Sequence, residues 1–265
     1  MTRRVLPLVA LAALVVLAGC AGPFGGGGVS DQRLDQPPAR PYAWNAGVDA
    51  HITVTKNATF RAVYRTNESQ VKLYRRDGFG GRNAIPLSAL RYRYPNGTVI
   101  NGSTFADHGG GISRSRSAVT VVLPTDGPPN ATGQLAFSSR STPKQFAIPT
   151  FVTGSYEVVL PAGRRVGFPL FGRVSPPGYE TSVVDGHTHI RWDDVTGDAV
   201  IVRFYLQRDL AIFAGIVAGL ILLGAGGALY YRRRIEALRR QREELGLDVE
   251  MEDDDVGDDG PPRIR

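Results

Sequence analysis

The longest hydrophobic run of the chain extends from Leu210 to Tyr231 and contains no charged residue and no proline. A run of this length crosses the roughly 30 Å hydrocarbon core of a bilayer as an α-helix, because only a helix satisfies its own backbone polar groups in lipid. Residues 209–231 are therefore predicted to form one transmembrane helix. The arginines at 232–234 follow the run directly, so the positive-inside rule predicts a cytoplasmic C-terminus and an extracytoplasmic N-terminal domain.

A different pattern fills residues 42–208, where short runs are separated by Gly, Pro, Asn and Asp. Apolar Phe60, Ala62 and Tyr64 recur at every second position, which is the period of a half-buried strand. An Asn-Gly pair at 96–97 is typical of a hairpin turn, because it tolerates positive φ. Strands are predicted at residues 51–54, 59–65, 70–75, 90–94, 118–123, 134–137, 145–148, 156–160, 181–184, 188–192 and 199–206. Many short strands without crossover helices predict a mainly β protein: an extracytoplasmic β-sandwich-like domain followed by one C-terminal transmembrane helix.

The first residues have the pattern of a targeting segment. Two arginines at 3–4 precede an apolar run at 5–17, and Leu17-Ala18-Gly19 precedes Cys20. This order predicts a signal peptide over residues 1–19 with a lipobox and a lipidated Cys20; an ordinary signal peptide or an uncleaved first helix is the alternative. The paired arginines also fit a twin-arginine export signal. Residues 20–41 are rich in Gly and Pro and are expected to form a flexible tether.

Charge narrows the classes of partner. The chain of 265 residues has a formal charge of +6, and residues 41–209 carry 19 Lys and Arg against 12 Asp and Glu. Such a surface favours anionic neighbours, so the expected partners are the lipid bilayer and an envelope protein or glycan. No nucleic acid is expected, because the basic residues are scattered and no recognition motif accompanies them. The single Cys excludes an intrachain disulfide.

Five Asn-x-Ser/Thr sequons occur in the β-rich region, more than its few asparagines would supply by chance. Their presence in an exported domain predicts glycosylation, although Asn-Gly-Thr is also ordinary turn chemistry. The predicted acceptors are Asn57, Asn67, Asn96, Asn101 and Asn130.

The apolar run carries small residues on one helix face, at Ala211, Gly215 and Gly219. This spacing allows close approach of a second helix, and it predicts a homodimer or a contact with another membrane protein through the span. The segment 232–265 begins with an arginine-rich helix that could attract anionic headgroups, and it ends in an acidic tail expected to be disordered.

Catalytic patterns are incomplete. His108 precedes a Gly-Gly-Gly run as in lipase oxyanion loops, but the chain has no Gly-x-Ser-x-Gly nucleophile motif. His187 and His189 would share one strand face, but no third metal ligand is evident. The carboxylates of Asp193, Asp194 and Asp198 lack the spacing of a calcium loop and read as a solvated turn. The chain is therefore predicted not to be an enzyme, and no metal site and no cofactor is expected.

A family resemblance accompanies these features. The lipobox at 17–20, the Asn-Gly-Thr turn at 96–98, the segment 154–161 and the junction 202–209 together resemble an uncharacterised family of haloarchaeal membrane lipoproteins. The similarity covers nearly the whole chain, and its strongest part is the junction that leads into the span. The resemblance implies a membrane lipoprotein with a β-rich outer domain, and it implies no activity or catalytic residue.

These observations lead to three function hypotheses. The first is a doubly anchored surface lipoprotein that acts as a non-catalytic binding or envelope-assembly module. The second is a signal-relaying subunit that couples the outer domain to its cytoplasmic tail. The third is an envelope hydrolase or metal enzyme that uses the histidines at 108, 187 and 189.

Overall fold

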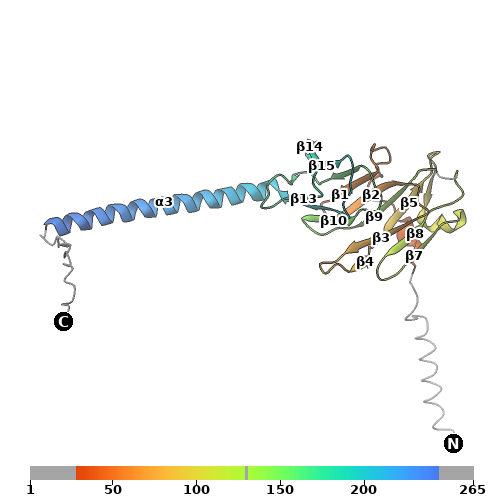
Figure 1. Ribbon diagram of the computed structural model, residues 1–265, viewed down its shortest axis with the longest axis horizontal. Helices are drawn as coiled ribbons and strands as arrows, with labels where there is room; N and C mark the ends of the chain where they lie inside the picture. The colour runs from red at the N-terminus through yellow and green to blue at the C-terminus, as the bar shows by residue number, and fades with distance from the viewer. Residues whose placement is uncertain (1–27, 129–130, 245–265) are drawn as a thin grey trace, which may run out of the picture. The chain divides into compact units, whose positions relative to one another are not determined.

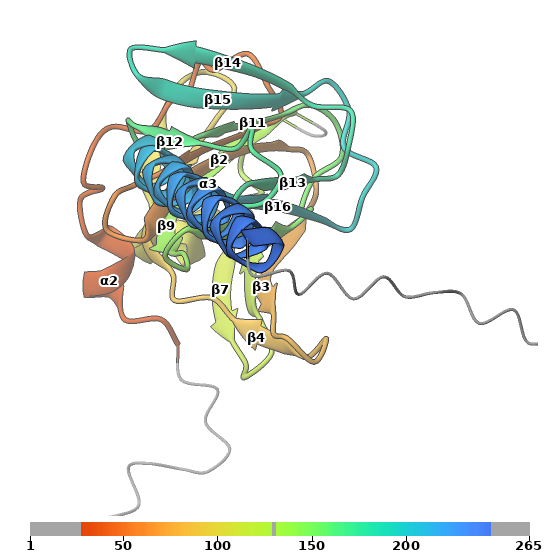
Figure 2. The same cartoon turned by 90° about the vertical axis from the view of Figure 1, so that its left-hand side faces the viewer.

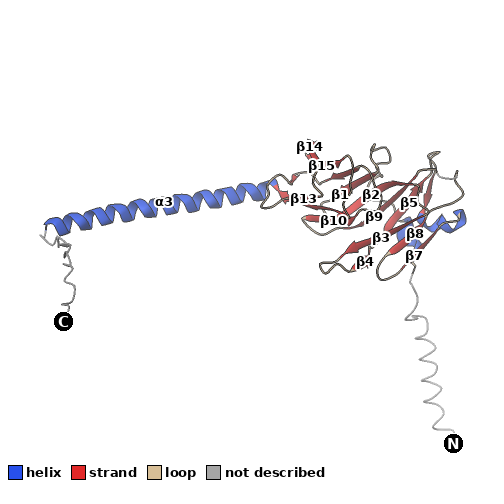
Figure 3. Ribbon diagram, in the orientation of Figure 1, coloured by secondary structure: helices blue, strands red, loops and turns tan. Residues whose placement is uncertain are grey.

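The computed structural model describes residues 28–128 and 131–244. The described chain forms two units, a β domain that ends at Gln207 and a segment that follows it. The β domain consists almost entirely of strands and loops, as Figure 3 shows. The predicted signal peptide, Cys20, Asn130 and the acidic tail lie outside the described residues.

The largest sheet has eight strands (Figure 1). In spatial order they are β14 (Glu180–Val184), β15 (His187–Trp192), β11 (Tyr156–Val159), β1 (Ala50–Val54), β2 (Thr59–Thr66), β9 (Gly133–Arg140), β5 (Ser88–Arg93) and β6 (Val99–Asn101). Neighbouring strands in this sheet pair antiparallel except β1 and β11, which are parallel. The long connection between these two strands makes their pairing impossible to read from local sequence.

Smaller sheets form the second layer, which Figure 2 shows on the other side of the core. One contains β10 (Gln145–Pro149), β16 (Ala199–Arg203) and β13 (Arg173–Ser175), and another contains β4 (Arg82–Ala84), β3 (Gln70–Arg76), β8 (Val119–Val122) and β7 (Gly111–Arg114). Aromatic contacts join the layers: the ring centroids of Phe60 in β2 and Phe146 in β10 lie 5.2 Å apart. Phe151 contacts both Tyr64 of the large sheet and Tyr74 of β3. The mainly β prediction is therefore confirmed.

Alternation of side chains decides which residues enter this core. In β1, Ala50, Ile52 and Val54 are buried, whereas His51 and Thr53 point to the outer face of the large sheet. The strand β15 alternates in the same way, and β11 does so up to Val158, so the outer face collects polar and charged side chains beside the buried Val159.

The structure corrects several boundaries. The expected strand at 199–206 is interrupted at Phe204, and its end forms a separate ribbon of β12 (Arg164–Arg165) with β17 (Tyr205–Leu206). The strands β4, β6, β7, β12 and β13 were not predicted, because each has only two to four residues. A 3₁₀ helix, η2 (Gly102–His108), was not predicted either.

The flexible tether predicted at 20–41 is wrong for the part of it that the structure describes. A short helix, α2, spans Asp31–Asp35 and buries Leu34, while Val29 is buried just before it. Arg91 of β5 donates from its guanidinium to the carbonyl oxygens of Leu34 at 3.0 Å and Asp35 at 2.8 Å. Two apolar side chains and these hydrogen bonds offset the entropy of ordering, which composition alone did not reveal.

The described part of the second unit is helical. Helix α3 runs from Gln207 to Glu244. Among the described helices it alone is long and apolar enough to cross a membrane, and its candidate span is Gln207–Arg242. The predicted span lies inside it, and the helix continues through the arginine-rich segment, as expected. A Cβ atom added at Gly215 or Gly219 would meet nothing within 4 Å.

Candidate functional site on the outer face of the large sheet

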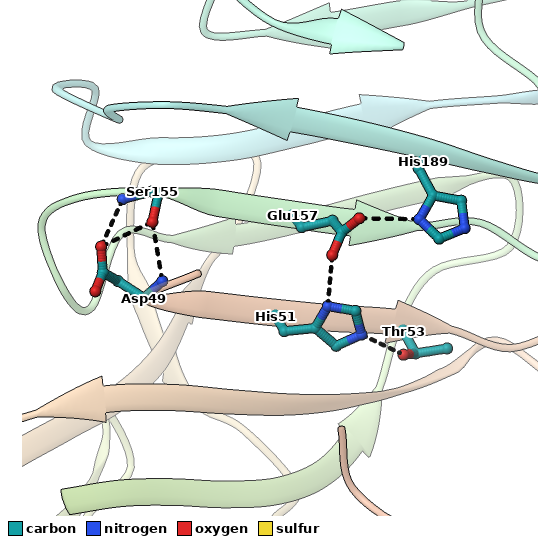
Figure 4. A network of polar contacts seen from close by, with 6 residues as sticks. All are labelled: Asp49, His51, Thr53, Ser155, Glu157 and His189. Carbon is teal, nitrogen blue, oxygen red and sulfur yellow. Dashed lines mark hydrogen bonds and ion pairs between the residues drawn. The ribbon is translucent and has the colours of Figure 1, made fainter. Parts of the chain in front are cut away.

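Three ionisable side chains meet on the outer face of the large sheet (Figure 4). Glu157 of β11 lies between His51 of β1 and His189 of β15. Its Oε2 is 2.9 Å from Nδ1 of His51, and its Oε1 is 2.9 Å from Nδ1 of His189. Nε2 of His51 lies 3.3 Å from the hydroxyl of Thr53. Strand order places these residues together, since the three strands are consecutive in the sheet.

A second pair of side chains holds the parallel strands in register. The backbone N–H and hydroxyl of Ser155 donate to Oδ2 of Asp49 at 2.9 and 2.8 Å. Gly154 precedes them with φ of 112°, and a Cβ there would meet the Asp49 carboxylate at 2.4 Å. Only Gly permits this close approach, so the turn fixes the start of β11 beside β1 and thereby places Glu157 opposite His51.

The environment biases the charges of the network. The side chains of His51, Glu157 and His189 are 13%, 18% and 26% exposed. Burial lowers the pKa of His51 below its ordinary value, and the nearby Glu157 opposes this only in part. Burial alone would raise the pKa of Glu157, but hydrogen bonds from His189 and His51 outweigh it and hold the pKa below its ordinary value. An ionised Glu157 that accepts from a neutral His51 follows from these directions.

The order Thr53, His51, Glu157 has the hydrogen-bond sequence of a nucleophile, base and orienting acid. The groove over the start of β2, the end of β9 and residues 33–39 has neither His51 nor Glu157 in its lining, however. Within the described residues, no group of three or more His, Cys, Asp and Glu is arranged to hold a metal ion.

The histidines singled out from the sequence are separated by the fold. Nδ1 of His187 pairs with the carbonyl oxygen of Leu160 at 2.8 Å, and His189 pairs with Glu157 instead. His108 lies in η2, which follows β6 at the opposite edge of the large sheet. Its ring pairs with Asp126, and Asp126 also accepts a hydrogen bond from the hydroxyl of Tyr94.

The carboxylates at 193–198 do not converge on a common point. Asp193 lies 3.9 Å from Nε of Arg191, and Asp198 lies 3.6 Å from Nη2 of Arg76. Both aspartates are largely exposed. This arrangement agrees with a solvated turn.

Four predicted glycan acceptors lie on exposed positions of turns or strand ends: Asn57, Asn67, Asn96 and Asn101. The hydroxyl of Ser103, which completes the last of these sequons, donates to Oδ2 of Asp35 at 2.6 Å. The sequence did not indicate His51 and Glu157, because they stand 106 positions apart and only the parallel pairing joins them.

Comparison with protein-family models finds one match, a family of unknown function named DUF5803, over residues 46–250. The chain belongs to this family. The DUF5803 match runs from just before β1 through the β domain and α3. Comparison with curated proteins finds no significant match.

Solved structures resemble the DUF5803 chain only weakly. One is an M1 zinc metallopeptidase from Deinococcus radiodurans, with 13% identity and a TM-score of 0.32. A variant of that peptidase bound to a Tyr-Ser-Ala substrate has 14% identity and a TM-score of 0.33. Each match covers 59% of this chain and 41% of the peptidase chain, so the aligned part spans less than half of the peptidase.

Proposed function

We propose that this protein is a membrane-anchored surface module whose β domain binds a partner outside the cytoplasm without catalysing a reaction on it. The observation that carries the proposal is that the titratable side chains bond to one another and do not line the groove beside them, whereas an enzyme site brings both features together. The side chains of His51, Glu157 and His189 hydrogen-bond to one another. The groove over β2 and β9 has arginines and hydroxyl side chains in its lining but no His, Asp, Glu or Cys. Acid–base catalysis needs the titratable group within reach of a bound substrate.

The connection to the membrane supports the same role. Strand β17 ends at Leu206 and α3 begins at the next residue, so no loop separates the last strand from the helix. Arginines follow the apolar run, which favours an extracytoplasmic β domain. Lipidation at Cys20 would add a second anchor, and exposed sequons would carry glycans on the same domain, as expected of a lipoprotein that supports envelope assembly.

Mass spectrometry of the native membrane form tests the anchoring. A mature N-terminus at a lipidated Cys20, absent from a Cys20→Ser control, together with glycan-bearing sequon peptides, is the expected result. A chain that retains Met1 and carries bare asparagines would contradict the lipoprotein and the glycoprotein assignments.

Site-specific photo-crosslinking in intact cells tests the binding role. A crosslinker at Ser182, which is exposed on β14 and pairs with His189, should capture one discrete partner. The same crosslinker at Lys72, exposed on β3 of the other layer, is the control and should not capture it. Identical crosslinking patterns at the two positions, or none at either, would contradict a specific partner on the outer face.

A further inference from the structure

A groove of about 490 Å³ lies on the β domain beside the start of β2 and the end of β9. Residues Pro37, Pro38 and Ala39 form part of its lining. Hydrogen bonds fix this segment on both sides, because Arg91 donates to the carbonyl oxygen of Asp35 at 2.8 Å and Arg61 donates to that of Pro41 at 2.8 Å. The two prolines further restrict the backbone, so the groove is preformed in the absence of a ligand.

The charge of the groove has one sign. Arg33, Arg61 and Arg140 contribute to its lining, and no Asp or Glu does. Sheet register brings two of them together: Arg61 faces Ser138 and Thr59 faces Arg140 across β2 and β9. The two arginines are thus diagonal neighbours on one face, about 7–8 Å apart at the backbone.

The charge of Arg61 is incompletely compensated. Its Nη1 donates to a carbonyl oxygen, but its Nε is buried and has no hydrogen-bond partner. Burial lowers the pKa of Arg61; Tyr42 opposes this shift, and the neighbouring charge of Arg40 adds to it. A partly desolvated cation without a carboxylate favours the approach of an anion, which would restore the missing electrostatic compensation.

We propose that this groove binds a phosphate group. Guanidinium groups match phosphate oxygens with paired N–H donors. The hydroxyls of Thr55 and Thr59 in the lining pair with each other at 2.7 Å, which leaves one O–H of the two available to donate to a ligand. The volume lies within the roughly 300–1,000 Å³ usual for small-molecule sites, so a phosphate ester with a small polar substituent fits. This inference deepens the proposed binding role, because it names the chemistry of one ligand.

Two sources can supply this chemistry, a phospholipid headgroup and a soluble phosphate ester. Register places Val159, Thr53, Arg61 and Ser138 in one row across the large sheet, so β11 ends at the same end of the sheet as the groove. From there the chain reaches Gly163, whose carbonyl oxygen accepts from the backbone N–H of Gln207 at 3.2 Å. The apolar run starts three residues later, at Leu210. The groove and the C-terminal residue of the β domain therefore lie at the same end of this sheet.

The test uses the full chain in nanodiscs of phosphatidylcholine, titrated calorimetrically with inorganic phosphate and with glycerol phosphate at constant ionic strength. The groove variant is Arg33→Gln/Arg140→Gln, which changes two exposed side chains and leaves the Arg61 anchor intact. The matched control, Arg75→Gln/Arg116→Gln, removes the same charge from exposed positions near β3 and β8. A parallel set of nanodiscs contains phosphatidylglycerol, and native mass spectrometry measures how much of that lipid each protein retains.

The wild type should bind a phosphate compound saturably or retain phosphatidylglycerol, and the groove variant should bind about tenfold more weakly. The control should stay within about twofold of the wild type, because exposed charges away from a site contribute little. Equal affinity for glycerol phosphate in both kinds of nanodisc identifies a soluble ester as the ligand. Loss of that binding in phosphatidylglycerol nanodiscs, with lipid retained, identifies the headgroup.

Two results would overturn the inference: equal weakening in both double variants, or neither phosphate binding nor lipid retention by the wild type. Neither result affects the photo-crosslinking test of the proposed function, because crosslinking at Ser182 detects a macromolecular partner and does not depend on whether the groove is occupied. If no partner is crosslinked but phosphate binding is intact, the proposed macromolecular partner is rejected and the proposed phosphate site stands.

Discussion

The Glu157→Gln variant tests the network on the outer face of the large sheet. Glu157 receives hydrogen bonds from two imidazoles, each at 2.9 Å, and all three side chains are mostly shielded from solvent. Glutamine has nearly the same shape and can still pair with both rings if one imidazole changes its tautomer. The substitution therefore removes the negative charge and leaves the packing in place.

The structure gives the size of the effect. A hydrogen bond to an ionised group contributes about 1.5–3 kcal/mol, and a neutral one about 0.5–1.5 kcal/mol, so each bond loses about 1 kcal/mol. Two such bonds predict a loss of about 2 kcal/mol in the free energy of unfolding at neutral pH. For a domain of this size the midpoint temperature should fall by about 4–8 °C. Glu180→Gln on β14, which removes the same charge from an exposed position, should change the midpoint little.

Acidification should act in a defined direction. The pKa of His51 is lower in the folded domain than its ordinary value, so the folded state takes up this proton less readily, and stability falls as the pH drops below the ordinary His range. The pKa of Glu157 is also lowered, so its contribution is present above the ordinary Glu pKa and is lost as the pH falls through the folded-state value. The Glu157→Gln variant lacks this second loss, and the two proteins should converge at low pH.

Tryptophan fluorescence is a suitable assay, because both tryptophans, Trp44 and Trp192, lie in the β domain and not in α3. Thermal unfolding of the full chain in a neutral detergent would be followed from about pH 8 down to about pH 2, because the contribution of Glu157 is lost only below the ordinary Glu pKa. A change below about 0.5 kcal/mol at neutral pH, or an unchanged pH profile in the variant, would refute the reasoning.

Three further predictions follow from other parts of the chain. Gly133→Ala should destabilise the β domain by about 1–3 kcal/mol, because its Cβ would meet the Tyr92 hydroxyl oxygen at 2.0 Å, whereas Gly111→Ala, with open space around it, should melt close to the wild type. Gly215→Ile/Gly219→Ile should weaken any self-association of α3 measured by energy transfer in bilayers, and an undiminished signal would argue against pairing through this face. Replacing the asparagines of the four described sequons by Gln should abolish glycan-dependent mobility shifts from those sites, while persistence of the full shift would place the glycans elsewhere.

The sequence predicted those features that depend on local pattern. Period-2 alternation was sufficient to find β2, β3 and β15 within a residue or so, because one buried face imposes the alternation on each strand separately. An uncharged run was equally sufficient for α3, since a helix that crosses lipid satisfies its hydrogen bonds within the segment itself. Short edge strands such as β6 and β13 gave no such signal, because each contains only three residues.

The candidate sites depended on contacts between distant parts of the chain. The parallel pairing of β1 with β11 brings His51 to Glu157, and the return of residues 36–41 onto the sheet places a wall beside Arg61. Composition favoured a loose tether for that returning segment, but burial of Leu34 and the hydrogen bonds from Arg91 hold it in place. By itself, the sequence determined the β-rich class and the apolar helix, because periodicity and hydrophobic length act within one segment. Only the tertiary structure decided which polar side chains meet, because strand order and register are set by burial across the whole domain.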